Sequence, residues 1–125
     1  MMSKTNSNNK KTGHWGEEVA KRYLIEKGLL IVDQNYRTPY GEIDLIAIDN
    51  EELVFVEVKT RSNNAFGYPE DAITDLKEVH LIDSAEYYLQ KYEDVSKPWR
   101  IDVIGIEGKS DDMSPKIRWY KNAIN

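Results

Sequence analysis

The first half of the chain shows a helical pattern followed by short apolar runs. One helix is expected over residues 13–28, because apolar residues recur there at helical spacing and Gly28 is a typical helix end. Its apolar face consists of Trp15, Val19, Ala20, Tyr23 and Leu24. The segment LLIVDQNYR, residues 29–37, predicts a short strand. The segment GEIDLIAIDNEELVFVEVKTR, residues 41–61, predicts two strands joined by a turn at DNEE, and therefore a β-hairpin.

The second half continues with a longer helix and two more strands. The helix is expected to follow Thr74, a favourable N-cap residue, and to end before Lys97 and Pro98. Its expected buried face consists of Leu76, Val79, Ile82, Ala85, Leu89 and Tyr92. Strands are predicted at WRIDVIGIE, residues 99–107, and, at a sheet edge, at KIRWYKNA, residues 116–123. The order α-β-β-β-α-β-β indicates a mixed α/β fold with helices packed on a small sheet.

Composition suits one domain and excludes several kinds of site. We expect residues 13–125 to form a single domain and the polar residues 1–12 to be a mobile tail. The absence of cysteine excludes disulfides and thiolate metal sites. No apolar run approaches the roughly 20 residues that span a bilayer, and the polar start of the chain lacks the apolar segment of a signal peptide. We therefore expect a cytoplasmic protein without membrane association.

Four ionisable residues stand near the open end of the predicted hairpin. If the turn is centred between residues 50 and 51, Asp44 lies opposite Glu57 and Glu42 lies opposite Lys59. Side chains alternate along a strand, so these four should share one face. The other face should carry only apolar residues, namely Ile43, Leu45, Ala47, Val54, Val56 and Val58. Near the turn both faces are apolar, which predicts a central position for the hairpin in the sheet.

The opposed carboxylates of Asp44 and Glu57 predict a metal site. Two carboxylates on a half-buried strand pair repel each other, and this repulsion costs stability. A divalent cation removes the repulsion, because Mg²⁺ binds one or two carboxylates and keeps other positions for water and phosphate oxygens. The adjacent Lys59 supplies a positive charge for an attacking water or a developing oxyanion. The alternative is a plain ion pair between Glu42 and Lys59, with the other two carboxylates at an exposed strand end.

The same residues resemble a known signature. Asp44 followed by the triplet EVK at residues 57–59 resembles the D-x(n)-(D/E)-x-K pattern of the PD-(D/E)xK, restriction-endonuclease-like superfamily, although Ile43 stands where a proline often precedes the aspartate. Longer blocks make the resemblance more specific. From about residue 13 to the end, the chain resembles the small bacterial YraN family of predicted nucleases, which is similar to the archaeal Holliday-junction resolvases. The blocks are GEEVAKRYLIEKGLLIVDQNYR, GEIDLIAIDNEELVFVEVKTR, AFGYPEDAI and Lys77.

The resemblance implies a restriction-endonuclease-like fold and a metal-dependent endonuclease that hydrolyses DNA phosphodiesters, with branched or structured DNA as the expected substrate. It implies that Asp44 and Glu57 bind Mg²⁺ or Mn²⁺ and that Lys59 positions or activates the water. Glu17 matches a glutamate that the resolvases use on the first helix. A helical wheel places Glu17 at the edge of the apolar face and Glu18 towards water. Because a resolvase cuts two strands symmetrically, a homodimer is also expected.

The overall charge is the feature that least favours DNA binding. The net charge is -5 and the pI is near 5.1, whereas phosphate contacts require Lys and Arg. We nevertheless expect Arg61, which follows Lys59, and Lys77, at the rim of the second helix, to contact phosphate; ordinary solvent exposure is the alternative for both. Two other functions stay open. One is a catalytically silent nucleic-acid-binding module with a nuclease fold, and the other is a scaffold protein that does not bind DNA.

Overall fold

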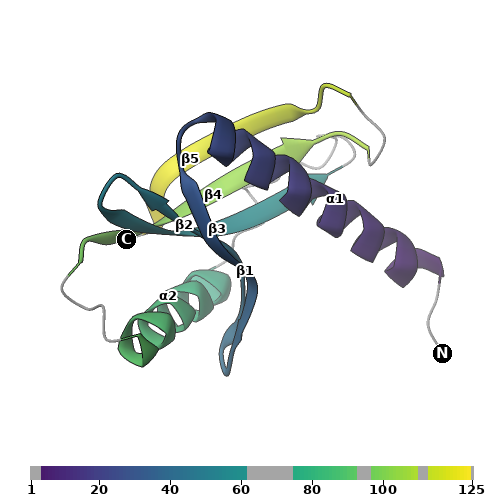
Figure 1. Cartoon of the computed structure of the whole chain (residues 1–125). Coiled ribbons are helices and arrows are strands. Elements are labelled where there is room, and N and C mark those ends of the chain that lie inside the picture. The colour runs from purple at the N-terminus through teal and green to yellow at the C-terminus, as the bar shows by residue number, and fades with distance from the viewer. Residues whose placement is uncertain (1–3, 62–74, 93–96, 110–112, 125) are drawn as a thin grey trace.

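The expected α-β-β-β-α-β-β order is confirmed. The computed structural model describes residues 4–61, 75–92, 97–109 and 113–124 (Figure 1). These residues form α1 (Lys4–Glu26), β1 (Leu30–Thr38), β2 (Gly41–Asp49), β3 (Glu52–Arg61), α2 (Asp75–Lys91), β4 (Trp99–Glu107) and β5 (Lys116–Ile124). In this part of the chain, neither helix has the length and apolarity that crossing a bilayer requires.

The strands form one mixed sheet in the order β1-β2-β3-β4-β5. The β1–β2, β2–β3 and β4–β5 pairs are antiparallel, and β3 and β4 are parallel. A parallel pair needs a crossover connection, and α2 lies in the chain between these two strands. The central position of the predicted hairpin is confirmed, because β2 and β3 lie inside the sheet and not at its edges.

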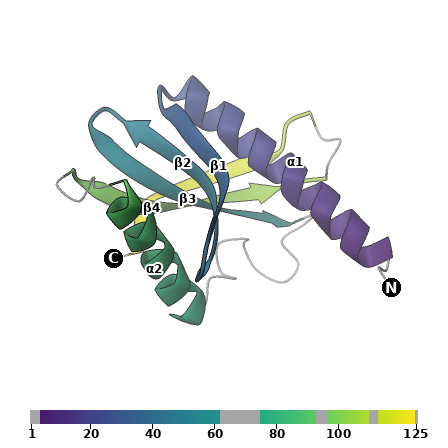
Figure 2. The same cartoon turned by 60° about the horizontal axis from the view of Figure 1, so that its bottom comes forward.

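The two helices cover opposite faces of the sheet (Figures 1 and 2). On the α1 face, Ala20 and Leu24 pack against aliphatic residues of β2, β3 and β4. On the α2 face, Leu81, Ala85 and Leu89 pack around Phe55 and aliphatic residues of the same strands. Each inner strand is therefore buried on both sides, as its nearly continuous apolar sequence predicts.

The hairpin register is confirmed over only part of its length. Paired positions run from Asp49–Glu52 to Leu45–Val56, as the centred turn predicts, and the ladder between β2 and β3 then stops. The expected cross-strand pairs Asp44–Glu57 and Glu42–Lys59 are therefore wrong as ladder pairs. Beyond the ladder, the Asp44 carboxylate takes the place of a backbone carbonyl, because its Oδ2 accepts the Val58 N–H at 2.8 Å.

The expected division of the hairpin faces also changes at this point. Ile43 packs in the α2-side core, whereas Leu45 packs in the α1-side core, so the regular alternation breaks between them. The β1–β2 turn leans towards α2, where the Thr38 and Ser84 hydroxyl groups lie 2.9 Å apart. The sequence predicts that the four ionisable residues share one face of a paired hairpin. In the structure, this part of the hairpin is where β2 and β3 separate.

The first helix starts earlier than expected and ends as predicted. It begins at Lys4 and not at Gly13, so residues 4–12 of the expected tail are helical. Extending a helix that is already formed requires one more ordered residue per hydrogen bond, and no apolar face is needed for this. The end is a Schellman cap. Gly28 has a φ of 95°, the Leu29 N–H donates to the Leu24 carbonyl, and the Gly28 N–H donates to the Ile25 carbonyl.

The second helix buries only part of the expected face. Ala85 and Leu89 are buried as predicted and Ile82 packs against the same core. The prediction is wrong for the other three residues, since Leu76 is 64%, Val79 51% and Tyr92 53% exposed. Leu81 is buried in their place, beside the small Ser84 and Ala85. Small residues let the helix approach the sheet closely, which favours this side of α2. The expected N-cap Thr74 lies outside the described residues.

Candidate metal centre

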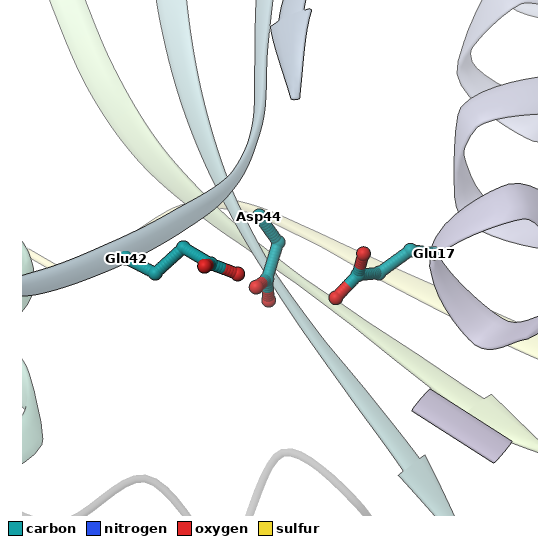
Figure 3. Close-up of side chains that lie close together, drawn as sticks. All are labelled: Glu17, Glu42 and Asp44. Carbon is teal, nitrogen blue, oxygen red and sulfur yellow. The ribbon is translucent and has the colours of Figure 1, made fainter. Parts of the chain in front are cut away.

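The site forms where β2 separates from β3. Asp44 is partly buried there, and its Oδ2 is held by the Val58 N–H. Glu17 reaches the same point from α1, and Glu42 reaches it from β2 (Figure 3). One carboxylate oxygen of each residue lies within 4.8 Å of one oxygen of each of the other two. Three acidic side chains from two elements therefore converge on a volume the size of a single ion.

Asn35 connects two of these carboxylates. Its Nδ2 donates to Glu17 Oε1 at 2.8 Å and to Glu42 Oε1 at 3.1 Å. Asn35 has a φ of 52°, a left-handed conformation that asparagine tolerates better than most residues. It lies on β1, so the cluster joins α1, β1 and β2.

Glu57 adds a fourth acid on the α2 side of the sheet. It is 4% exposed, and its flanking residues Val56 and Val58 face the opposite core. Its Oε1 lies 3.6 Å from the Lys77 ammonium and 3.9 Å from the Lys59 ammonium. Its Oε2 is buried and has no hydrogen-bond partner among the described residues. A buried carboxylate oxygen without a partner is costly, and a cation or a water would satisfy it.

Burial and mutual repulsion shift the titration of the two inner acids. Loss of water contact, reinforced by the charges of Glu57 and Glu17, raises the pKa of Asp44 to about 8, although the Val58 N–H and Lys77 act in the opposite direction. Burial also raises the pKa of Glu57, even though Lys77 and Lys59 stabilise its charged form. Both shifts mean that the folded site favours protonation of these acids more than an unfolded chain does, and a bound cation would compete with those protons.

Asp102, another buried acid of the same sheet, is fully satisfied. It has no exposed surface, and it accepts hydrogen bonds from Arg100 Nε at 2.9 Å and Trp119 Nε1 at 2.9 Å. The Asn122 backbone N–H donates to it at 2.8 Å. Asp102 is thus neutralised by the Arg100 guanidinium and accepts hydrogen bonds from these three donors, which explains its burial by a structural role. Among the described residues, Asp44 accepts a hydrogen bond from the Val58 N–H and has acidic neighbours, so the same explanation does not fit it.

The donor set fits a hard divalent cation. Carboxylate oxygens are the ligands that Mg²⁺ and Mn²⁺ prefer, and the buried Glu57 Oε2 supplies an oxygen that has no other described partner. Asp44 and Glu57 are the ligand pair that the sequence predicts, although they are not paired in the β2–β3 ladder. Asp44 with Glu17 and Glu42 is a second possible ligand set, and Asp44 belongs to both.

The approach of α1 to the sheet places Glu17. Gly16, directly before it, is buried, and a Cβ on this glycine would overlap Thr60 Oγ1 and lie 3.1 Å from Thr60 Cβ. The absence of a side chain at Gly16 thus brings the helix against the end of β3. Glu18, on the other side of the helix, forms an ion pair with Lys21 at 3.5 Å. The expected inward position of Glu17 is confirmed, and Glu18 stays at the surface.

The remaining predicted residues divide into two groups. Lys59 and Lys77 are close to the site through Glu57, and Lys77 contacts this acid from α2. Arg61, at the end of β3, pairs in register with Glu107 of β4, and its backbone carbonyl accepts the Gly108 N–H. These contacts tie the Arg61 backbone to β4 and do not bring its side chain to the acidic cluster.

The sequence did not predict Glu42 and Asn35 as members of the site. Glu42 was expected to pair with Lys59, but it lies 3.7 Å from the Arg37 guanidinium and accepts from Asn35. Its position two residues before Asp44 was the available signal, because alternate residues of a strand share a face. Asn35 gave no such signal, since its role depends on a backbone conformation that the local pattern does not specify.

Comparisons with known proteins place these residues in a family context. A model of the family described as "Uncharacterised protein family UPF0102" matches residues 16–106. A UPF0102 protein of Dehalococcoides mccartyi is 39% identical over 117 residues, which cover 94% of this chain and 95% of that protein. One from Clostridioides difficile is 46% identical over 99 residues, covering 79% and 87%. One from Legionella pneumophila is 46% identical over 114 residues, covering 90% and 93%.

Proposed function

This chain belongs to the UPF0102 family, the YraN family that its sequence resembles, and we propose that it is a metal-dependent endonuclease-like protein that hydrolyses DNA phosphodiesters. The observation that carries the proposal is the placement of Asp44. One of its carboxylate oxygens lies within 4.8 Å of an oxygen of Glu17 and of Glu42, and the charge of the buried Glu57 also acts on it, whereas the buried Asp102 is satisfied by donors of the chain itself. Such an arrangement costs stability without a cation and becomes favourable with one.

The neighbouring residues suit hydrolysis of a phosphodiester. A bound Mg²⁺ or Mn²⁺ would supply Lewis-acid stabilisation of phosphate oxygens and would lower the pKa of a bound water. Lys59 is partly exposed beside Glu57, where its ammonium can donate a hydrogen bond to the attacking water or to a phosphate oxygen. In the reaction, the water oxygen bonds to phosphorus, the P–O bond to the leaving strand breaks, and the leaving oxygen gains a proton as the water loses one.

Attraction to DNA has to be local, because the net charge of -5 repels phosphate at a distance. Lys59 and Lys77 stand beside the acidic cluster, and both ammonium groups are partly exposed. We propose that these lysines, together with Arg61 at the end of β3, contact the backbone of the bound strand. Branched or structured DNA is the proposed substrate, in a cytoplasmic homodimer whose two sites would cut symmetric strands.

Cleavage of labelled DNA tests this proposal. Purified protein would be incubated with four-way junction, flap, single-stranded and duplex DNA in Mg²⁺, Mn²⁺ or EDTA. We expect metal-dependent cutting, strongest on a branched substrate, and its loss in Lys59→Ala with most DNA affinity kept, since one phosphate contact among several contributes little to affinity. Equal cutting by wild type and Lys59→Ala would indicate a contaminating nuclease and contradict the proposal.

Thermal unfolding tests the metal site without requiring cleavage. Asp44→Asn keeps nearly the same shape and is neutral without taking up a proton, so it should raise the melting temperature in EDTA at neutral pH by the equivalent of about 1 kcal/mol. Millimolar Mg²⁺ or Mn²⁺ should stabilise wild type by mass action and should stabilise Asp44→Asn much less. Equal metal-induced shifts would refute the metal site. A normal metal response without cleavage of any substrate would favour the catalytically silent binding module.

A further inference from the structure

Asn35 occupies the position on β1 that faces Asp44. The ladder pairs Gln34 with Leu45 and Tyr36 with Ile43, which leaves Asn35 opposite Asp44 in the register. Asn35 does not continue the extended strand there, because its φ is 52°. The side chain is exposed, so packing does not require this conformation. Asn35 thus departs from strand geometry at the edge of the acidic cluster of Glu17, Glu42 and Asp44. This suggests that the function of its side chain is to contact that cluster.

The contacts of its amide are suited to holding acids together. Its two hydrogen bonds, at 2.8 Å and 3.1 Å, go from one NH₂ group to Glu17 on α1 and Glu42 on β2. An NH₂ group has two hydrogens, so these acids use its full donor capacity. Each acid still has a second oxygen for a cation, although that of Glu42 also lies 3.7 Å from the Arg37 guanidinium. A neutral amide also does not compete with the cation electrostatically, as a lysine or arginine in this position would.

We propose, resting on the metal site of the proposed function, that Asn35 is a positioning residue that holds Glu17 and Glu42 at the separation a divalent cation requires. Without its two donors, the like charges of Glu17 and Glu42 would drive the two glutamates apart, since Glu17 comes from a helix and is half-exposed. The cation would then have to bring them together itself. Partners of this kind typically account for a 10- to 100-fold change in metal affinity.

The test is Mn²⁺ binding by the full chain, followed through the electron paramagnetic resonance signal of free Mn²⁺. Asn35→Gly removes the amide and accepts the positive φ without strain. Asn50→Gly is the matched control, because Asn50 is exposed, has a φ of 58° and lies at the far end of the β2–β3 hairpin. We expect Mn²⁺ binding about 10- to 100-fold weaker in Asn35→Gly and unchanged in Asn50→Gly.

The outcomes separate this inference from the metal site on which it rests. Wild-type affinity in Asn35→Gly would overturn the inference and leave the metal site standing, even if the melting temperature in EDTA fell, since that fall would show a structural role only. No Mn²⁺ binding by wild type would overturn both. A double-mutant cycle with Glu17→Gln adds a second criterion. Asn35→Gly should cost less affinity in the Glu17→Gln background, and full additivity would exclude action through Glu17.

Asn35→Asp gives an independent variant of nearly the same shape. It replaces both amide hydrogens with acceptor oxygens and adds a fourth carboxylate to the cluster. The melting temperature in EDTA should therefore fall, and the rise that Mn²⁺ causes should exceed that of wild type, because the cation then neutralises more charge. If neither quantity differs from wild type, Asn35 is not coupled to the cluster and the inference fails.

Discussion

Gly16→Ala is the substitution that tests how α1 is seated on the sheet. The added Cβ would overlap Thr60 Oγ1 and would lie 3.1 Å from Thr60 Cβ and 3.3 Å from Cγ2. Rotation of the threonine side chain can relieve the first overlap, but it leaves the 3.1 Å contact with Thr60 Cβ unchanged. Ordinary van der Waals contact begins at 3.4 Å, so the helix or the strand has to shift. A shift of α1 also moves Glu17 away from Asp44.

Gly13→Ala on the same helix gives the reference for the magnitude. Nothing lies within 4 Å of a Cβ at Gly13, so that variant should gain only helix propensity, about 1 kcal/mol. Gly16→Ala gains the same propensity and loses about 1–3 kcal/mol through overpacking. The difference between the two variants therefore isolates the contact with Thr60, and we expect Gly16→Ala to be the less stable by about 1–3 kcal/mol.

Denaturant unfolding of both alanine variants, each with and without Thr60→Ala, measures this difference. Thr60→Ala removes the overlapping hydroxyl, so it should recover much of the stability of Gly16→Ala and change Gly13→Ala little. Mn²⁺-induced stabilisation should be smaller in Gly16→Ala than in Gly13→Ala, because Glu17 is displaced. If the two alanine variants have equal stability and equal metal response, the close approach at Gly16 does not position Glu17 and the reasoning is wrong.

Two further predictions concern the acids of the site. The pKa of Asp44 is raised to about 8 in the folded protein, against about 4 in an unfolded chain, so its contribution to stability is complete below pH 4 and is lost as the pH rises to 8. As the pH rises from 4 to 8, the melting temperature in EDTA should fall more in wild type than in Asp44→Asn, and the increase in melting temperature that metal causes in wild type should become larger. Parallel curves of melting temperature against pH for the two proteins would contradict the raised pKa. Glu17→Gln should weaken the Mn²⁺ response and Glu18→Gln should not, and equal effects would place the cation away from α1.

The sequence predicted the parts of the fold that are governed by repeated apolar contacts. The register from Asp49–Glu52 to Leu45–Val56 follows from a short turn and two strands that are apolar on both faces, because any slip would misplace many side chains at once. The prediction fails at Asp44, where one side chain replaces the backbone as the partner of Val58. A pattern of residue types does not reveal this exchange.

The buried face of α2 could be predicted only in part, for a related reason. Two apolar stripes run along this helix, and the sequence gives each a similar helical period. One contains Leu76 and Val79, and the other contains Leu81 and Leu89. The shape of the sheet decides which of the two stripes is buried, and the buried stripe is the one beside the small Ala85. The candidate site shows the same division, since acids spaced along one hairpin could be predicted, whereas an asparagine from the neighbouring strand could not.

Two aspartates of the sheet, the buried Asp102 and the partly buried Asp44, have very different surroundings. Asp102 is surrounded by an arginine and further donors, so its charge is satisfied by groups the chain itself supplies. Asp44 is fixed by one backbone N–H and otherwise faces other carboxylates, while the nearby lysines contact Glu57. Among the described residues, these lysine ammonium groups lie beside Glu57 and the Arg37 guanidinium lies beside Glu42, whereas Asp44 is held by the Val58 N–H. The divalent cation that we propose would supply positive charge at Asp44 itself, and Lys59 would then act on the substrate.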